Sequence, residues 1–309
     1  RIISVMLATV FALSVIGCGT KDTKEQDAYR QYGITCMESG KYEDAVKAFQ
    51  NALGESIGHI GEKELDICFY KAKAQALDGK TKDALATYNA IIKYNKDARA
   101  YYLRGDLYMD MGEEKKGKAD FESAVQHGKK NYEIYIGIYE SLSRHEKKDE
   151  GQKYLSAAME IKGDKPEDEL YKGRISYLLG ENKDAISYLE KAKEHKQMLA
   201  SYYLGLAYDA NGDSDKAKKC IAEYIKSGVA TSYDLYELGM QEMQDGNYKN
   251  ALTYFNSGLE LEKVPNKQNL MKSAIAAYEY SGDFDSAKKM MKEYLKAYPD
   301  DEEAKHENT

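Results

Sequence analysis

The 309-residue chain has no tryptophan and only three prolines. Proline lacks a backbone donor and breaks helix interiors, so its scarcity beside abundant Ala, Lys, Glu and Leu favours a helical fold. The chain also lacks a basic block, and its formal net charge is −7, from 45 basic and 52 acidic residues. A mildly acidic chain of this kind is a poor candidate for binding nucleic acid.

Motifs for catalysis and metal binding are missing as well. The sequence has no CxxC, HExxH, GxSxG or P-loop motif, and none of its five histidines stands at ligand spacing from another His or Cys. Residues Asp209 to Asp215 are similar to a calcium loop, but the glycine is out of register and the distal glutamate is missing. We therefore expect no catalytic residue, no metal site and no cofactor, and a protein that is not an enzyme.

The first 18 residues differ in character from the rest. Arg1 precedes an apolar run from Ile2 to Ile16, which is shorter than the ~20 residues of a membrane span. A basic start and a short apolar run are typical of a signal peptide. The sequence Val15-Ile16-Gly17-Cys18 resembles the lipobox of bacterial lipoproteins, in which the signal is cut before a cysteine that is diacylated.

This resemblance implies a signal peptide at residues 1–17 and lipidation of Cys18, with a tether over residues 18–25. It also implies that the protein lies in the cell envelope, held by its lipid on the non-cytoplasmic side of the membrane. An ordinary secretory signal or a plain N-terminal anchor is the alternative. The other three cysteines, Cys36, Cys68 and Cys220, are odd in number and irregularly spaced, which argues against a disulfide framework and predicts buried thiols.

Glycines recur through the rest of the chain with a period near 34. They are Gly40, Gly79, Gly112, Gly180, Gly212, Gly246 and Gly282. The gap of 68 between Gly112 and Gly180 is two periods, and Glu146 stands midway. A fixed period of this length indicates a helical repeat array.

Three further columns keep the same phase. A first column holds glycines: Gly33, Gly105, Gly173, Gly205 and Gly239. Twelve residues later comes a small residue: Ala45, Gly117, Ala185, Ala217 and Ala251, with Ala84, Gly151 and Ala287 in the copies that lack the first glycine. Four residues after that comes a large apolar residue: Phe49, Tyr88, Phe121, Leu155, Leu189, Ile221, Phe255 and Met291.

These columns resemble the tetratricopeptide repeat, L-G-x-x-Y followed by A and F. Leu204-Gly205-Leu206-Ala207-Tyr208 with Ala217 is the clearest copy. The resemblance implies an all-α solenoid, a right-handed superhelix of about eight helix pairs over residues 26–301, with residues 302–309 as a disordered tail. In each pair the turn glycine ends helix A, and the small residues let helices A and B approach. The fourth copy, residues 132–165, is the most divergent.

The C-terminal edge of the array lacks an obvious capping helix. Solenoids usually close with a polar outer face, so we expect Met271, Ile275 and Tyr278 to be partly exposed there. Such an edge predicts self-association or contact with a partner.

The resemblance also implies that helix A of each copy lines a concave groove through its positions 2, 5, 9, 12 and 13. The early copies place charged residues there: Asp27, Arg30, Asp66, Lys73, Asp106, Asp110, Glu133, Glu140 and Arg144. The later copies are richer in Tyr, Leu and Met, and the predicted partner-binding residues are Tyr177, Tyr202, Leu206, Asp209, Tyr233, Tyr236 and Met240. Such side chains suit extended or helical peptide segments, but packing between helices is an equally open interpretation.

The sequence therefore predicts an envelope lipoprotein that serves as a protein–protein interaction scaffold and binds a protein or peptide segment in the groove. One alternative is a structural subunit of an envelope assembly, secretion or wall-remodelling complex. Another is a surface lipoprotein that captures a carbohydrate or solute, because tyrosines permit stacking on sugars.

Overall fold

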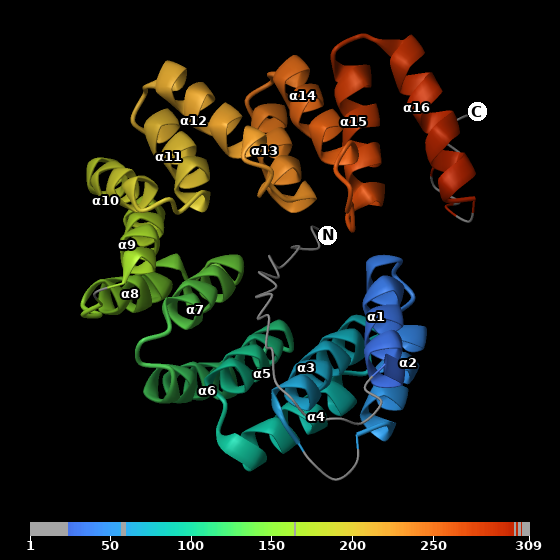
Figure 1. Ribbon diagram of the computed structural model, residues 1–309, viewed down its shortest axis with the longest axis vertical. Helices are drawn as coiled ribbons and strands as arrows, with labels where there is room; N and C mark the ends of the chain where they lie inside the picture. Colours follow the sequence, from blue (N-terminus) through green and yellow to red (C-terminus); the bar gives the residue numbers. More distant parts are fainter. Residues whose placement is uncertain (1–23, 57–59, 164, 300, 302–303, 305–309) are drawn as a thin grey trace. The chain divides into compact units, whose positions relative to one another are not determined.

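The computed structural model describes residues 24–56, 60–163, 165–299, 301 and 304. In this part of the chain the regular elements are sixteen α-helices (Figure 1). The predicted signal peptide and Cys18 lie outside the described residues. No helix in the described ranges is long and apolar enough to cross a bilayer.

The helices alternate between two kinds, A and B, and each A helix packs against the B helix that follows it. The A helices are α1 (Lys24–Glu38), α3 (Glu62–Leu77), α5 (Ala98–Asp110), α7 (Tyr132–Arg144), α9 (Pro166–Leu179), α11 (Leu199–Ala210), α13 (Ser232–Gln244) and α15 (Lys267–Tyr280). The B helices are α2 (Tyr42–Gly54), α4 (Thr81–Asn95), α6 (Glu114–His127), α8 (Lys148–Met159), α10 (Asn182–Glu194), α12 (Ser214–Lys226), α14 (Tyr248–Leu259) and α16 (Phe284–Ala297). The predicted all-α solenoid of eight helix pairs is confirmed.

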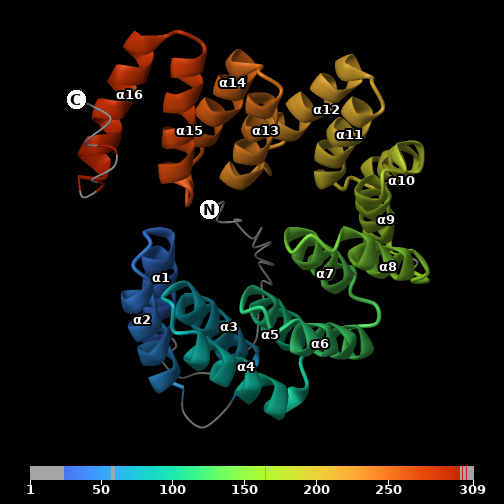
Figure 2. The same ribbon diagram turned by 180° about the vertical axis from the view of Figure 1, so that it is seen from behind.

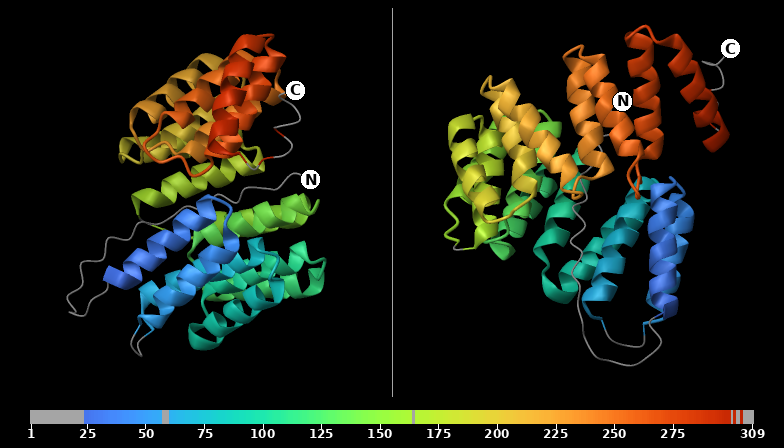
Figure 3. Two further views of the ribbon diagram at one scale, coloured as in Figure 1. Left: turned by 90° about the vertical axis from the view of Figure 1, so that its right-hand side faces the viewer. Right: turned by 45° about the horizontal axis from the view of Figure 1, so that its top comes forward.

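The chain divides into two units at Gly228. The N-terminal unit holds α1 to α12, and its successive pairs pack on one another, as the contacts of α2 with α3 and of α10 with α11 show (Figure 2). The C-terminal unit holds α13 to α16, which lie side by side in chain order (Figure 3). Each unit is described below by itself.

The periodic glycines end the A helices in the left-handed conformation. The φ angles of these seven turn glycines lie between 70° and 85°. Glu146 adopts the same conformation at the eighth turn, with a φ of 61°. The backbone of the divergent fourth copy therefore follows the repeat, although Glu146 stands where the other copies have glycine. Its two helices, α7 and α8, are regular.

The predicted close approach of helices A and B is confirmed at the first glycine column. A Cβ added at Gly239 would lie 2.2 Å from Cε1 of Phe255, and one at Gly205 would lie 2.4 Å from Cδ1 of Ile221. The fourth copy reverses the arrangement, because Tyr139 occupies the glycine position and Gly151 faces it. The large side chain on helix A is thus matched by a glycine on helix B, which keeps the two helices closely packed.

The C-terminal edge differs from the prediction. Met271 and Ile275 are only 5% and 4% exposed, and they form a cluster with Met291, Tyr294 and Ala304. The expectation that they are partly exposed is wrong for these two residues, because α16 and Ala304 cover them. Tyr278 is half-buried.

Asp301 holds this covering segment in place. Its carboxylate accepts hydrogen bonds from Tyr294 and from Lys272, whose Nζ lies 2.8 Å away. Asp301, the last residue of the predicted repeat array, therefore makes structural contacts with α15 and α16. Cys36 and Cys220 are buried free thiols, as predicted, and the free thiol Cys68 is half-buried.

Candidate partner-binding site

The candidate site lies on the residues of the A helices that the repeat pattern places on one side, here called the A-helix face. In the N-terminal unit these residues come from α1, α3, α5, α7, α9 and α11. Their charges are the first feature to examine, because an unpaired charge on this face would point to a partner of opposite charge.

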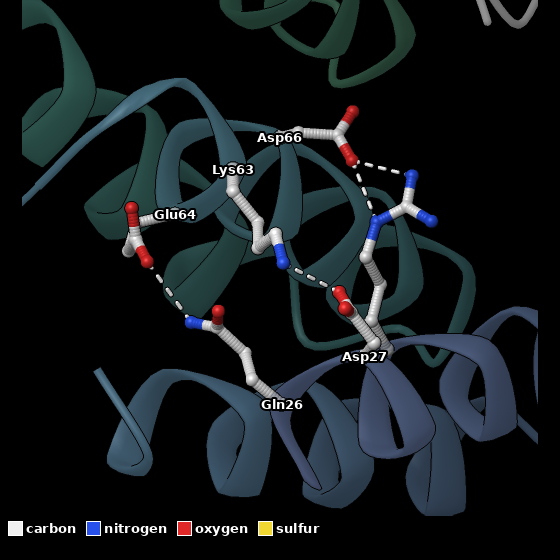
Figure 4. Close-up of polar contacts among 6 residues, drawn as sticks. Gln26, Asp27, Lys63, Glu64 and Asp66 are labelled. Atoms are coloured by element: carbon white, nitrogen blue, oxygen red, sulfur yellow. Dashed lines mark hydrogen bonds and ion pairs between the residues drawn. The ribbon is translucent and has the colours of Figure 1, made fainter. Parts of the chain in front are cut away.

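Between α1 and α3 the charged and polar side chains pair with one another (Figure 4). Nη2 of Arg30 lies 2.6 Å from Oδ2 of Asp66, and Nζ of Lys63 lies 2.7 Å from Oδ1 of Asp27. Nε2 of Gln26 donates to Glu64 at 3.0 Å. These contacts join residues 36 to 38 positions apart, so they connect one repeat to the next.

Arg144 makes the corresponding link from α7 back to α5. It donates to Asp106 and also pairs with Asp110 at 3.4 Å. His145 Nε2 lies 3.1 Å from the same Asp110. Asp106 is 2% exposed, and burial raises the pKa of its carboxyl group although Arg144 opposes the shift.

Arg174 links α9 to α7 in the same way. Its guanidinium lies 3.0 Å from Glu140 and 3.3 Å from Glu133. Burial raises the pKa of Glu140, and Arg174 opposes the rise. On its other side Arg174 lies over the ring of Tyr203 of α11, 5.5 Å from the centroid. Most of the charged residues that the sequence places on this face therefore serve contacts between repeats.

Lys73 of α3 differs from these residues. Its side chain makes no ion pair within the described residues, and burial lowers the pKa of its ammonium group. Lys73 is therefore an exception among the charged residues of the A-helix face, most of which form ion pairs.

The predicted residues of α9 and α11 have a different environment. Tyr177, Tyr202 and Leu206 are half-buried and pack against the cluster that contains Leu170, Leu189 and Leu204. Asp209 is exposed and has no ion pair within the described residues. Burial, and after it the carboxylate of Asp209, raise the pKa of Tyr177, so Asp209 is within electrostatic reach of that hydroxyl. The structure therefore groups these residues as an apolar surface with one carboxylate beside it.

Tyr233, Tyr236 and Met240 belong to the C-terminal unit. All three are half-buried, and Tyr236 and Met240 pack against the cluster around Phe255 and Leu270. The ring centroids of Tyr236 and Phe255 are 6.1 Å apart. These side chains therefore contact the core of the C-terminal unit and remain partly exposed.

A pair of tyrosines at the A–B turns of the C-terminal unit was not singled out from the sequence. Tyr248 and Tyr280 stack with their ring centroids 5.3 Å apart and their planes at 19°. Tyr280 and the nearby Phe284 are each 68% exposed. The repeat alignment could have indicated these residues, because Tyr248 and Phe284 are the first residues of B helices, and most of the other B helices begin with a polar residue.

Among the described residues no group of three or more His, Cys, Asp or Glu side chains is placed to hold a metal ion. The side chains of the A-helix face can therefore contribute apolar contacts and ion pairs to a bound partner.

Comparisons with solved structures find several similar chains. A tetratricopeptide repeat protein from Parabacteroides merdae is 12% identical, with 82% of this chain and 99% of that chain covered and a TM-score of 0.48. PilW, described as a type IV pilus biogenesis factor, is 16% identical over 81% of this chain and 100% of its own, with a TM-score of 0.43. The C-terminal part of a tetratricopeptide repeat protein from Cytophaga hutchinsonii is 14% identical over 79% and 98%, with a TM-score of 0.39. These values are too low to bear on function.

No curated protein matches the sequence. Sequence models of the tetratricopeptide repeat family match residues 33–92, 98–126, 199–227 and 268–301. The helix pairs between these matches keep the same turn and the same packing. Tetratricopeptide repeats generally mediate binding between proteins. The chain belongs to the tetratricopeptide repeat family.

Proposed function

We propose that the protein is an envelope lipoprotein that holds a segment of a partner protein against the A-helix face of α9 and α11. One observation carries this proposal. The charges on the A-helix face of α5, α7 and α9 are mostly engaged by neighbouring repeats, whereas Asp209 is exposed and unpaired within the described residues. It lies beside the half-buried Tyr177, Tyr202 and Leu206.

The partner segment follows from this chemistry. Tyrosines bring large contact areas at low cost in conformational entropy and are enriched among the residues that dominate binding energies. The segment presents an apolar side chain to Tyr202 and Leu206 and a lysine or arginine to Asp209. Tyr233, Tyr236 and Met240 form a separate apolar surface on the C-terminal unit. The lipid on Cys18 keeps the whole array at the membrane surface.

Photo-cross-linking in intact cells tests this proposal on the full chain. A benzophenone amino acid replaces Leu206 in one strain and the exposed Lys218 of α12 in another. Lys218 is the control, because it lies on the neighbouring B helix of the same unit and shares its local environment in the cell.

A partner adduct at position 206 that is absent at position 218 supports the proposal. The substitution Asp209→Lys should then reduce the yield of the adduct, because it replaces the attractive carboxylate by a like charge. An adduct of the same partner at position 218 alone would instead indicate a subunit held through its B helices.

A further inference from the structure

The stacked tyrosines lie at the A–B turns of the C-terminal unit, and Tyr280 occupies the same repeat position as Asp110 and Arg144. Tyr248 is the first residue of α14 and Tyr280 is the last residue of α15, and the turn that follows Tyr280 leads into Phe284 of α16 (Figure 1). The two rings are nearly parallel, with centroids 5.3 Å apart. Tyr280 remains 68% exposed in spite of this stacking.

The repeat itself does not require aromatic residues at these positions. The B helices α4, α6, α8, α10 and α12 begin with polar or charged residues, namely Thr81, Glu114, Lys148, Asn182 and Ser214. The other A helices end in Glu38, Leu77, Asp110, Arg144, Leu179, Ala210 and Gln244. Tyr42 and Phe284 also open B helices, so an aromatic residue at the position of Tyr248 recurs in the array. Tyr280 is the one aromatic residue that ends an A helix within the described residues.

A shallow hollow of about 420 Å³ lies against the two rings. Its polar lining comes from Asn247, Lys249, Asn250 and Ser281. Asn247 occupies the N-cap position of α14 but its side chain makes no cap hydrogen bond, so the amide is available to a ligand. Asn250 donates to Glu242 at 3.1 Å, which fixes the orientation of its side chain.

The geometry points to a saccharide site: we propose that a pyranose ring of a neutral glycan binds in this hollow, against the Tyr248–Tyr280 pair. The C–H groups on one face of a pyranose carry small positive charges, which suit the negative face of an aromatic ring. Its hydroxyl groups both donate and accept hydrogen bonds, and so do the amides of Asn247 and Asn250. An extended peptide would need a row of pockets or a free strand edge, and this hollow is single and short.

The proposal does not depend on the partner-binding role of the A-helix face. The two sites use different residues, so each can fail without the other. The full chain in detergent is titrated by isothermal calorimetry with two neutral probes, cellotriose and triacetylchitotriose. The probes share β-1,4-linked pyranose rings and differ in their acetamido groups, so they separate plain glucans from amino-sugar polymers.

The variant Tyr280→Ala removes an exposed ring and should leave the fold intact, which circular dichroism checks. The matched control is Tyr42→Ala, because Tyr42 also opens a B helix, α2, but lies in the other unit. Loss of one aromatic contact is expected to weaken binding about tenfold. Saturable binding of either probe to the wild type and to Tyr42→Ala, with that loss in Tyr280→Ala, supports the proposal.

Two results would overturn it. One is the absence of saturable heat with both probes. The other is equal affinity of Tyr280→Ala and Tyr42→Ala for a probe that binds, which would place the sugar elsewhere. If sedimentation shows a dimer of the wild type that Tyr280→Ala abolishes, and neither sugar binds, the aromatic pair contacts a second copy of this chain instead.

Discussion

Glu146 is expected to weaken the fold at its own turn, and its replacement by glycine should stabilise the N-terminal unit. Seven of the eight A–B turns in the described residues use glycine at a positive φ, and the eighth uses Glu146 at 61°. Glu146 is exposed and makes no ion pair or side-chain hydrogen bond within the described residues. The substitution Glu146→Gly therefore removes backbone strain without removing a contact.

The size of the effect follows from two opposing terms. A residue with a Cβ costs about 1–2 kcal/mol in the left-handed conformation. Glycine loses more conformational freedom on folding, which costs about 0.5–1 kcal/mol. The difference is a stabilisation of about 0.5–1 kcal/mol for Glu146→Gly. For a unit of this size it raises the melting temperature by about 1–4 °C.

Equilibrium unfolding in urea and thermal unfolding, both followed by circular dichroism, measure the change. Two variants serve as controls. Glu146→Ala removes the same charge but keeps a Cβ, so it should not stabilise. Gly112→Ala is the reverse experiment at a turn with a φ of 74°, where an added Cβ meets nothing within 4 Å. It should destabilise by about 1 kcal/mol through backbone strain alone.

Equal gains from Glu146→Gly and Glu146→Ala would refute the reasoning, because the stabilisation would then come from the lost charge. A neutral Gly112→Ala would refute it as well.

Three further predictions concern packing, lipidation and the C-terminal segment. Gly239→Ala should lower the free energy of unfolding by about 1–3 kcal/mol because its Cβ would lie 2.2 Å from a buried ring, whereas Gly54→Ala, with nothing within 4 Å, should be neutral or slightly stabilising. Cys18→Ser should abolish the acyl mass seen by mass spectrometry; the same mass shift in the variant would contradict lipidation. Hydrogen bonds from Lys272 and a tyrosine hold the pKa of Asp301 well below its usual range. The stability that Asp301→Asn removes should therefore be constant above about pH 4 and be lost only in stronger acid; a difference that already vanishes near pH 5 would contradict this.

The features that the sequence predicted well are local. The left-handed conformation of a turn glycine depends on that residue alone. Gly205 contacts Ile221, which lies only sixteen positions later in the chain, across one turn. Both follow from steric rules that act within a single helix pair. The same rules located the unusual Glu146, because the repeat period left no other residue for that turn.

The contacts between repeats could not be predicted in the same way. The sequence placed Arg144 and Asp106 on one face but did not pair them, because a pairing across 38 residues depends on how far one repeat rotates against the next. The C-terminal segment failed for a related reason. The sequence shows no obvious capping helix, and only the positions of Lys272 and Tyr294 on neighbouring helices show that Asp301 has partners that hold the covering segment in place.

This distinction also decides how the candidate site is interpreted. Asp110 and Asp209 are both carboxylates near the end of an A helix, and the sequence places both on the A-helix face although it predicts partner binding only for Asp209. Asp110 meets Arg144 and His145 of the next A helix, so its charge is engaged by the fold. Asp209 is exposed and has no ion pair within the described residues, and its carboxylate, after burial, raises the pKa of Tyr177 on α9. Within the N-terminal unit, Asp209 is therefore a charge that remains open to a partner, whereas the charge of Asp110 is already engaged.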